Sequence, residues 1–413
     1  MISLIAAAVY ALHAISLPSG WSLVTPTSGF DVSTEPTSEA IARNGAVAVL
    51  LTRTGNPGGA ARRLLIVRAN GTRLILQPRS LDIANAFPHS TKPSDCMADV
   101  DSCPYFERVT LAPDGTPFVT LTSDFSGAYS GSERRGFVWN GRWHPVPPGK
   151  AFSGVGKPDD PENVSISAAD GGLIFAFVGD YQDRFPNEDL DLALQDRYYM
   201  AEVSGVSYEG VTVALGIGNA TAMSGAFVAG FDGDLKLVPS RNHDLVAVAW
   251  RCAFNKLANA RACARNTLGP GIAYGIDSYG EAVGDNESSV PDLGSLPLHS
   301  AGFPVLWRHG HTLMLSKDDR GAAYAISGSG VIAGTLTTGP GSDALLSGFV
   351  ANAREKTPRA FPLDELVQND RGRHVEAALG VADDGRILAF VTDRDGRSEL
   401  AVLAPAPAVR KSR

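Results

Sequence analysis

A unit of about 55 residues recurs along the chain, and this period restricts the fold more than any other feature. Its two clearest copies are AYGIDSYGEAVG, residues 273–284, and AYAISGSGVIAG, residues 323–334. Both run from a small–aromatic–small triplet and an isoleucine through a polar turn and a glycine to a hydrophobic pair that ends in glycine. A repeat of this length indicates one supersecondary element per copy, stable only when packed against its neighbours.

Turn glycines mark seven copies of the unit: Gly45, Gly115, Gly171, Gly225, Gly280, Gly330 and Gly385. Successive glycines are 70, 56, 54, 55, 50 and 55 residues apart. Four of them follow an Asn or Asp, namely Asn44, Asp114, Asp170 and Asp384. Such pairs supply the positive φ of a tight hairpin, so each copy is expected to begin with two strands joined by a short turn.

Two further strands complete each predicted unit. The third is apolar and ends near an aromatic residue, as at Trp139, Trp250 and Trp307. Because one four-stranded sheet cannot bury both of its faces, the sheets are expected to pack around an axis. We therefore predict an all-β chain: a single β-propeller of about seven four-stranded blades with loop insertions over residues 20–408, followed by a frayed tail, 409–413. A strand within residues 20–32 is expected to complete the last blade.

The repeat resembles a known family over residues 272–366. The pattern A-x-x-I-x-x-x-G-x-x-x-G, followed by G-F-x-x-W-x-x-G and a leucine, is similar to the HAF-type repeats of exported bacterial β-propeller proteins. The resemblance implies a secreted propeller. It supplies no catalytic residue, because the motif is structural and a fold alone does not define an activity.

The N-terminus predicts export. Residues 2–17 contain no charged side chain, and Ala14, Ser16 and Ser19 offer cleavage points, so residues 1–19 are interpreted as a signal peptide. The run lacks a preceding Lys or Arg, and the alternative is a buried strand or helix. No other stretch is apolar for long enough to span a bilayer. We expect a secreted or periplasmic protein.

The four cysteines fit an oxidising compartment. They form two close pairs, Cys96 with Cys103 and Cys252 with Cys263, each between strand-like runs. The spacings are too wide for a typical zinc site, and no histidine lies beside either pair. We predict two local disulfides, with four unpaired buried thiols as the alternative.

One acidic segment could bind calcium. Residues 179–199, GDYQDRFPNEDLDLALQDRYY, contain the candidate ligands Asp180, Asp183, Glu188, Asp189 and Asp191. Carboxylate oxygens suit this ion, although the spacing does not match an EF-hand loop. The same residues also fit an acidic loop insertion that binds no calcium, with a short helix that begins at Asn187 and has acidic residues in its first turn. No other cofactor is predicted.

Motifs for other chemistry are missing from the sequence. It contains no G-x-S-x-G, no phosphate-binding loop, no dinucleotide fingerprint and no H-E-x-x-H. His309 and His311 flank a turn glycine and are interpreted as exposed turn residues rather than a metal pair. The net charge of −8 and the lack of a basic run argue against nucleic-acid binding.

Two classes of function remain. The first is a binding or scaffold module, a monomer with a protein or glycan partner. The second is a hydrolase or lyase with carboxylates at the mouth of the central channel. The predicted inner strands are rich in Ala, Gly, Ser, Ile and Val, which favours binding. Convergence of five acidic residues on one pocket would favour an active or metal site instead: Asp180, Glu188, Asp232, Asp277 and Asp285.

Overall fold

The computed structural model describes most of the predicted repeat units. The described residues are 9–24, 38–54, 62–78, 83, 87, 104–125, 131–145, 163–170, 173–179, 197–204, 207–216, 219–224, 227–232, 246–251, 264–287, 302–338, 345–368 and 372–406. For 124–125, 131–134, 231–232, 338 and the described residues between 163 and 221, the description is limited to the backbone.

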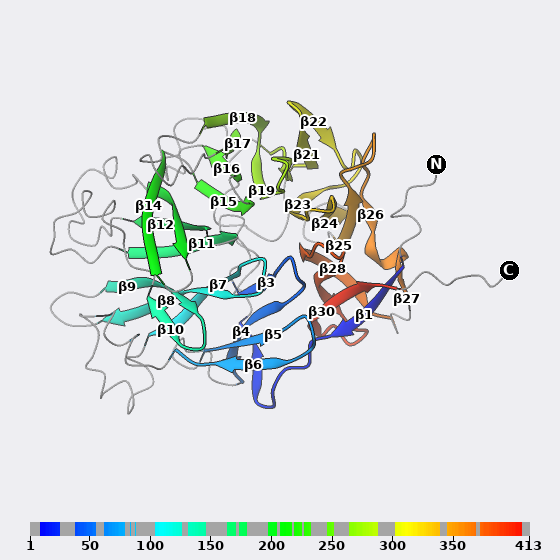
Figure 1. Cartoon of the computed structure of the whole chain (residues 1–413). Coiled ribbons are helices and arrows are strands. Elements are labelled where there is room, and N and C mark those ends of the chain that lie inside the picture. The colour runs from blue at the N-terminus through cyan, green and yellow to red at the C-terminus, as the bar shows by residue number, and fades with distance from the viewer. Residues whose placement is uncertain are drawn as a thin grey trace.

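The described strands form seven sheets, which we number in chain order (Figure 1). Sheet 1 comprises β2 (Trp21–Leu23), β3 (Glu39–Ile41), β4 (Val47–Arg53), β5 (Arg63–Val67) and β6 (Arg73–Leu76). Sheet 2 comprises β7 (Tyr105–Leu111), β8 (Pro117–Phe125), β9 (Gly131–Trp139) and β10 (Trp143–Pro145). Sheet 3 comprises β11 (Asn163–Asp170), β12 (Leu173–Gly179), β13 (Arg197–Ser204) and β14 (Ser207–Gly216). Sheet 4 comprises β15 (Asn219–Ser224), β16 (Phe227–Asp232), β17 (Val246–Arg251) and β18 (Ala264–Pro270). Sheet 5 comprises β19 (Ile272–Ile276), β20 (Ala282–Asp285), β21 (Pro304–Arg308) and β22 (His311–Met314).

Sheets 6 and 7 complete the set. Sheet 6 comprises β23 (Arg320–Ile326), β24 (Val331–Thr338), β25 (Leu345–Asn352) and β26 (Phe361–Pro362). Sheet 7 comprises β28 (His374–Val381), β29 (Ile387–Thr392), β30 (Ser398–Pro405), β1 (Tyr10–Ala14) and β27 (Val367–Gln368). A short 3-10 helix, η3 (Leu363–Glu365), lies between sheets 6 and 7. Among the described residues, no helix is long and apolar enough to cross a bilayer.

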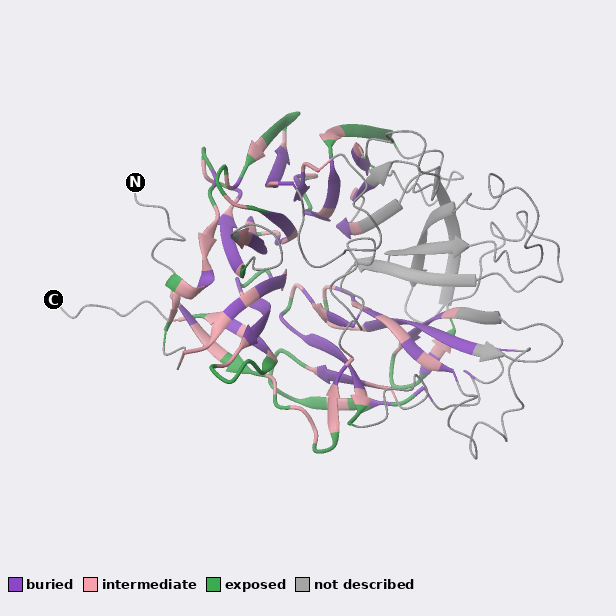
Figure 2. Ribbon diagram, turned by 180° about the vertical axis from the view of Figure 1, so that it is seen from behind, coloured by how far each residue is buried: buried purple, intermediate pink, exposed green. Residues whose placement is uncertain are grey.

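The sheets follow one another around an axis. Each contacts the next in chain order, and β28 of sheet 7 contacts β3 of sheet 1, so the series returns to its start (Figure 1). Inner strands are mostly buried, whereas outer strands such as β18 and β22 are largely exposed (Figure 2). The prediction of an all-β propeller is confirmed.

The hairpin turns behave as the Asn-Gly and Asp-Gly pairs predict. Five of the seven turn glycines are described, and all have positive φ: Gly45, Gly115, Gly280, Gly330 and Gly385. At Gly45, a Cβ atom would also lie 2.0 Å from Nη2 of Arg386. The positive φ of the turn therefore favours glycine at this position, and a Cβ atom would also displace the flexible end of the Arg386 side chain.

These turns gather on one side of the ring, because antiparallel order brings the first-to-second and third-to-fourth turns of a sheet to the same end. We call this side the turn face. It is formed by residues 42–46, 112–116, 277–281, 327–331 and 382–386 from the first kind of turn, and by 68–72, 139–142, 308–311 and 353–360 from the second.

Large apolar side chains fill the spaces between neighbouring sheets. Leu50 and Leu64 of sheet 1 share one cluster with Phe106, Phe137 and Trp143 of sheet 2, and all five are buried. Alanine and glycine are frequent in the inner strands β19, β23 and β28, as the sequence predicts, whereas β7 carries larger side chains. Close packing of aromatic residues between sheets and alanine or glycine near the axis explains why the repeat alternates these residue types.

The N-terminal segment joins the ring differently from the prediction. The expectation that residues 20–32 complete the last sheet is wrong, because Trp21–Leu23 pairs with β4 of sheet 1. Tyr10–Ala14 pairs with β30 of sheet 7 instead. Tyr10 is only 2% exposed, so burial of this apolar segment favours the pairing. The strand lies within the predicted signal peptide, residues 1–19, whose cleavage stays a prediction.

Candidate binding face

The calcium candidates and the cysteines lie outside the described residues. These are Asp180, Asp183, Glu188, Asp189 and Asp191, together with Cys96, Cys103, Cys252 and Cys263. The calcium site and both disulfides therefore stay predictions. Among the described residues, no group of three or more His, Cys, Asp or Glu side chains could hold a metal ion.

The two acidic candidates of sheet 5 do not converge. Asp277 lies in the turn after β19, whereas Asp285 ends β20 and pairs with Ile272 at the start of β19. The hairpin therefore separates them along its length. The side chain of Asp232 lies outside the described residues, as do Asp180 and Glu188.

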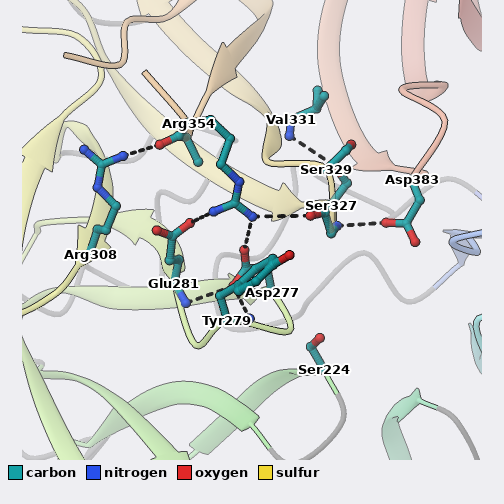
Figure 3. A network of polar contacts seen from close by, with 12 residues as sticks. Ser224, Asp277, Tyr279, Glu281, Arg308, Ser327, Ser329, Val331, Arg354 and Asp383 are labelled. Carbon is teal, nitrogen blue, oxygen red and sulfur yellow. Dashed lines mark hydrogen bonds and ion pairs between the residues drawn. The ribbon is translucent and has the colours of Figure 1, made fainter. Parts of the chain in front are cut away.

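Asp277 belongs instead to an ionic network on the turn face (Figure 3). Arg354, from the third-to-fourth turn of sheet 6, donates to Asp277 Oδ2 at 3.0 Å and to Glu281 Oε2. It also donates to the Gly328 carbonyl at 3.3 Å. The guanidinium carbon lies 4.5 Å from the ring centre of Tyr279, which is 69% exposed. One arginine therefore joins sheets 5 and 6 through two buried carboxylates.

Local geometry positions both carboxylates. Asp277 Oδ1 accepts hydrogen bonds from the backbone N–H groups of Tyr279 and Glu281, each at 2.9 Å. Burial raises the pKa of Glu281; Arg354 opposes this effect and the neighbouring charge of Asp277 adds to it. Because Arg354 bridges both carboxylates and offsets one of their two negative charges, the network is suited to holding the turns together rather than to proton transfer.

Similar contacts link the turns on either side. The Gly328 N–H donates to Asp383 Oδ1 at 2.8 Å, and the Asp383 N–H donates to the Arg43 carbonyl at 3.0 Å. The Asn44 N–H donates to the Pro113 carbonyl at 3.1 Å, and the Arg43 side chain donates to Ser224 Oγ of sheet 4. Turns from six of the seven sheets are thus tied together, which makes the turn face a rigid platform.

A groove opens between sheets 1 and 2 on this face. Its volume is about 480 Å³. It is lined by residues from four hairpin turns and the strands that lead into them: Asn44, Ala46, Ile66, Arg68, Ala69, Asn70, Leu74, Asp114, Gly115, Thr116, Pro117, Trp139, Asn140 and Gly141. The volume falls within the ~300–1,000 Å³ range of small-molecule sites.

Turn chemistry fixes the polar groups of this groove. Oδ1 of Asn44 accepts from the Ala46 N–H, and Oδ1 of Asn70 accepts from the Thr72 N–H, each at 2.9 Å. Oδ1 of Asp114 accepts from Thr116 N–H at the same distance. With Oδ1 engaged, each asparagine can offer its Nδ2 donors to a ligand, and Asp114 can offer Oδ2 as an acceptor.

Trp139 supplies the aromatic surface of the groove. The side chain is partly exposed, and its ring packs edge-on against Trp143 with 5.0 Å between ring centres. The indole of Trp143 is buried and donates to the Gln77 carbonyl at 3.0 Å. The exposed part of Trp139 is thereby held in one orientation at the groove.

Glu39, on the inner strand β3, is a buried carboxyl group that the sequence did not predict. The residue is 3% exposed, and within the described part of the chain neither carboxyl oxygen has a hydrogen-bond partner of normal geometry. It shares a face of β3 with Ile41, which packs against Ala377 and Leu379 of sheet 7. Burial raises the pKa of Glu39 to about 7, against a smaller lowering by Ser38.

Asp285 lies with two tyrosines at the opposite end of the sheet 5 hairpin. Tyr274 donates to Asp285 Oδ2 at 3.3 Å and packs edge-on against Tyr324 of sheet 6, with 5.6 Å between ring centres. Each tyrosine occupies a bulge of its strand, a device that re-aims a side chain. Burial raises the pKa of both tyrosines, so both are hydroxyl donors near neutral pH.

No family model matches the chain, and no curated protein matches it. Solved structures do. The β-propeller domain of the trilobed protease from Pyrococcus furiosus is similar, with a TM-score of 0.50 and 8% identity over 89% of this chain and 92% of that one. That domain has an open velcro topology, whereas here β1 pairs with β30.

Two further structures have lower scores. The acylaminoacyl peptidase of Pyrococcus horikoshii has a TM-score of 0.49 and 11% identity over 92% of this chain and 53% of that one, so this chain spans about half its length. An ulvan lyase of polysaccharide lyase family PL25 has a TM-score of 0.37 and 9% identity, with coverages of 95% and 94%. At 8% identity, the likeness to the Pyrococcus furiosus domain shows the fold alone: the chain has a β-propeller fold.

Proposed function

We propose that the chain is an exported binding module that presents its turn face to a protein or glycan partner. The groove between sheets 1 and 2 is the observation that carries this proposal. It combines a volume of about 480 Å³ with an aromatic ring and polar groups fixed by their own turns. A preorganised concave surface of this kind reduces the entropy lost when a ligand binds.

Export is part of the proposal. It is supported by the apolar segment within residues 1–19, by the two close cysteine pairs and by the resemblance to HAF-type repeats. Binding without turnover is supported by the state of the acidic groups on the turn face. Asp277 and Glu281 are both ion-paired with Arg354, and Asp114 already accepts a backbone hydrogen bond.

A hydrolase or lyase is the second candidate, and Glu39 favours it. A buried carboxyl group whose pKa is raised to about 7 is suited to act as a general acid or base at neutral pH. Under this alternative, Glu39→Gln would abolish turnover while leaving ligand binding intact.

Binding and product formation measured on the same samples separate the two candidates. We expect the purified chain to bind a neutral polysaccharide, a uronate-containing polysaccharide or carboxymethylated casein without shortening it. The variant Asn140→Trp, which fills the groove, should abolish that binding. The control variant Asp395→Trp changes an exposed residue in the turn between β29 and β30 of sheet 7, away from the turn face, and should bind normally.

The alternative outcomes are distinct. New reducing ends or unsaturated uronate products that disappear in Glu39→Gln would replace the binding module with an enzyme. Equal binding by the two tryptophan variants would remove the groove from the function.

A further inference from the structure

The lining of the groove combines two kinds of side chain. Trp139, Leu74 and Ile66 are apolar, whereas Asn44 and Asn70 carry side-chain amides and further residues add polar groups. Apolar side chains together with fixed hydrogen-bonding groups match a ligand with an apolar face and a polar rim. A pyranose ring has this character, because its C–H groups lie on its faces and its hydroxyls around its edge.

The charges of the groove balance. Arg68 contributes one positive charge and Asp114 one negative charge, and the other polar side chains of the lining are uncharged amides and a hydroxyl. A site without net charge does not concentrate anionic or cationic ligands. This balance favours an uncharged ligand over a uronate, a phosphate or a basic peptide.

An extended peptide fits the groove less well. Peptides that add a strand to a sheet need open backbone N–H and C=O groups at the edge. In the groove walls, the N–H groups of Ala46, Thr72 and Thr116 are occupied by the side chains of their own turns. The hydrogen bonds to a ligand would therefore come from side chains, which suits hydroxyl groups.

We infer that the groove between sheets 1 and 2 binds a neutral hexopyranose unit of a glycan, with Trp139 against the sugar face and Asp114 and Asn70 on its hydroxyls. The inference rests on the proposed function and narrows the partner class of the same site. Asp114 Oδ2 accepts from hydroxyl donors, and Asn70 Nδ2 donates to a hydroxyl oxygen.

Calorimetric titration of the full chain with neutral hexasaccharides tests this inference. The probes are cellohexaose, laminarihexaose, mannohexaose and chitohexaose, with hexagalacturonate as the charged comparison. We expect saturable binding of at least one neutral probe and weaker binding of hexagalacturonate. Asp114→Asn retains the Oδ1 acceptor of the turn and should weaken binding about tenfold, since a charged acceptor is lost.

Matched variants guard against effects on folding. Asp393→Asn makes the same change in a turn of sheet 7, where Oδ1 accepts from the Asp395 N–H at 2.8 Å, and should leave affinity unchanged. Trp139→Leu should weaken binding about tenfold, whereas Trp139→Phe retains most of it. Tyr279→Leu removes an exposed aromatic residue outside the groove and should have no effect.

Two results overturn the inference. One is that no neutral hexasaccharide binds at millimolar concentration, and the other is that Asp114→Asn and Asp393→Asn change affinity equally. If casein binding is lost in Asn140→Trp while no saccharide binds, the proposed function stands and the saccharide inference fails. If no probe binds in a groove-dependent way, both fail.

Discussion

Glu39 makes the stability of the protein depend on pH. Its pKa lies near 7 in the folded chain and near 4.5 otherwise, so the folded state holds the proton more tightly. Stability is therefore full below about pH 4.5 and declines as pH rises toward 7. Because the residue is 3% exposed, the loss is on the order of 3 kcal/mol.

Glu39→Gln should remove this dependence. We expect the variant to be more stable than the natural chain at pH 8 and nearly equal at pH 4.5, as measured by urea unfolding at both values. The exposed Glu365 provides the control, since Glu365→Gln should keep the natural pH profile. An unchanged profile in Glu39→Gln would mean that this carboxyl group is not buried in the folded protein.

Arg354 stabilises the turn face by forming ion pairs with both Asp277 and Glu281. Arg354→Met leaves both carboxylates buried without their cation and should lower the free energy of unfolding by about 2 kcal/mol. The arginine side chain is 37% exposed, which keeps the loss below that of a fully buried pair. Adding Asp277→Asn and Glu281→Gln should recover most of the loss in urea unfolding; further destabilisation by the triple change would contradict the assignment.

The sequence identifies some residue roles better than others. Asn44, Asp114 and the glycines after them are predicted as turn formers, and the structure confirms this, because hairpin chemistry is local. Arg354 and Asp277 are 77 residues apart, and their contact depends on how two sheets pack. The burial of Glu39 could not be predicted for the same reason, because it depends on how β3 packs against sheet 7.

At the scale of elements, His374 joins sheets 6 and 7. Its Nδ1 lies 2.5 Å from Oδ2 of Asp364 in η3, and its Nε2 lies 2.6 Å from the Leu346 carbonyl in β25. Burial lowers the pKa of His374, but the carbonyl and the carboxylate raise it by more, so it lies above the ordinary value of 6.5. The protonated ring can donate to both acceptors at once.

The junction of sheets 6 and 7 should therefore weaken as pH rises. The contribution of His374 is complete below pH 6.5 and is lost as pH passes its raised pKa. Asp364→Asn should shift the histidine titration, followed by NMR, to lower pH and shrink the difference in melting temperature between pH 6 and pH 8. A titration that does not move would show that the two side chains are not in contact in solution.

Element boundaries were predicted where the repeat is regular. Trp139 ends β9, and Trp307 lies near the end of β21, as expected from the place of these aromatic residues in the repeat unit. The strand that completes sheet 7 was misplaced, because Tyr10–Ala14 lies inside an apolar run that also fits a signal peptide. Pairing with β30, nearly 400 residues away, leaves no local trace in the sequence.

For the whole molecule, β1 links the two ends of the described chain. Tyr10 and Leu12 pack in the cluster of sheet 7, and burial raises the pKa of Tyr10 to about 12. A variant that begins at residue 20 should lose about 2–4 kcal/mol of unfolding free energy, since sheet 7 loses its β1 side chains. Equal urea midpoints for the two forms would contradict a structural role for β1.

Export provides a separate test of the N-terminus. N-terminal sequencing of the protein recovered from the periplasm or medium should reveal a start after Ala14, Ser16 or Ser19 if the signal peptide is cleaved as predicted. Recovery of chains that begin before Tyr10 would overturn the predicted cleavage and leave β1 in the mature sheet.

The groove belongs to the whole molecule rather than to any single motif. The sequence analysis predicts two of its four turns, at Gly45 and Gly115, and the strand order places all four on one face. The space between two sheets depends on the tertiary packing of Trp139 and Trp143, which the repeat does not specify. The fold could therefore be predicted from short sequence motifs, whereas the site could not.

Hydrogen exchange of the full chain, with and without the hexasaccharide that binds most tightly, tests the central claim most directly. The account predicts added protection in the turns at 42–46, 68–72, 112–116 and 139–142, with the turns of sheets 5 to 7 unchanged. Protection near Glu39 or Asp285, or at the turns around Arg354, with none in the groove would contradict it.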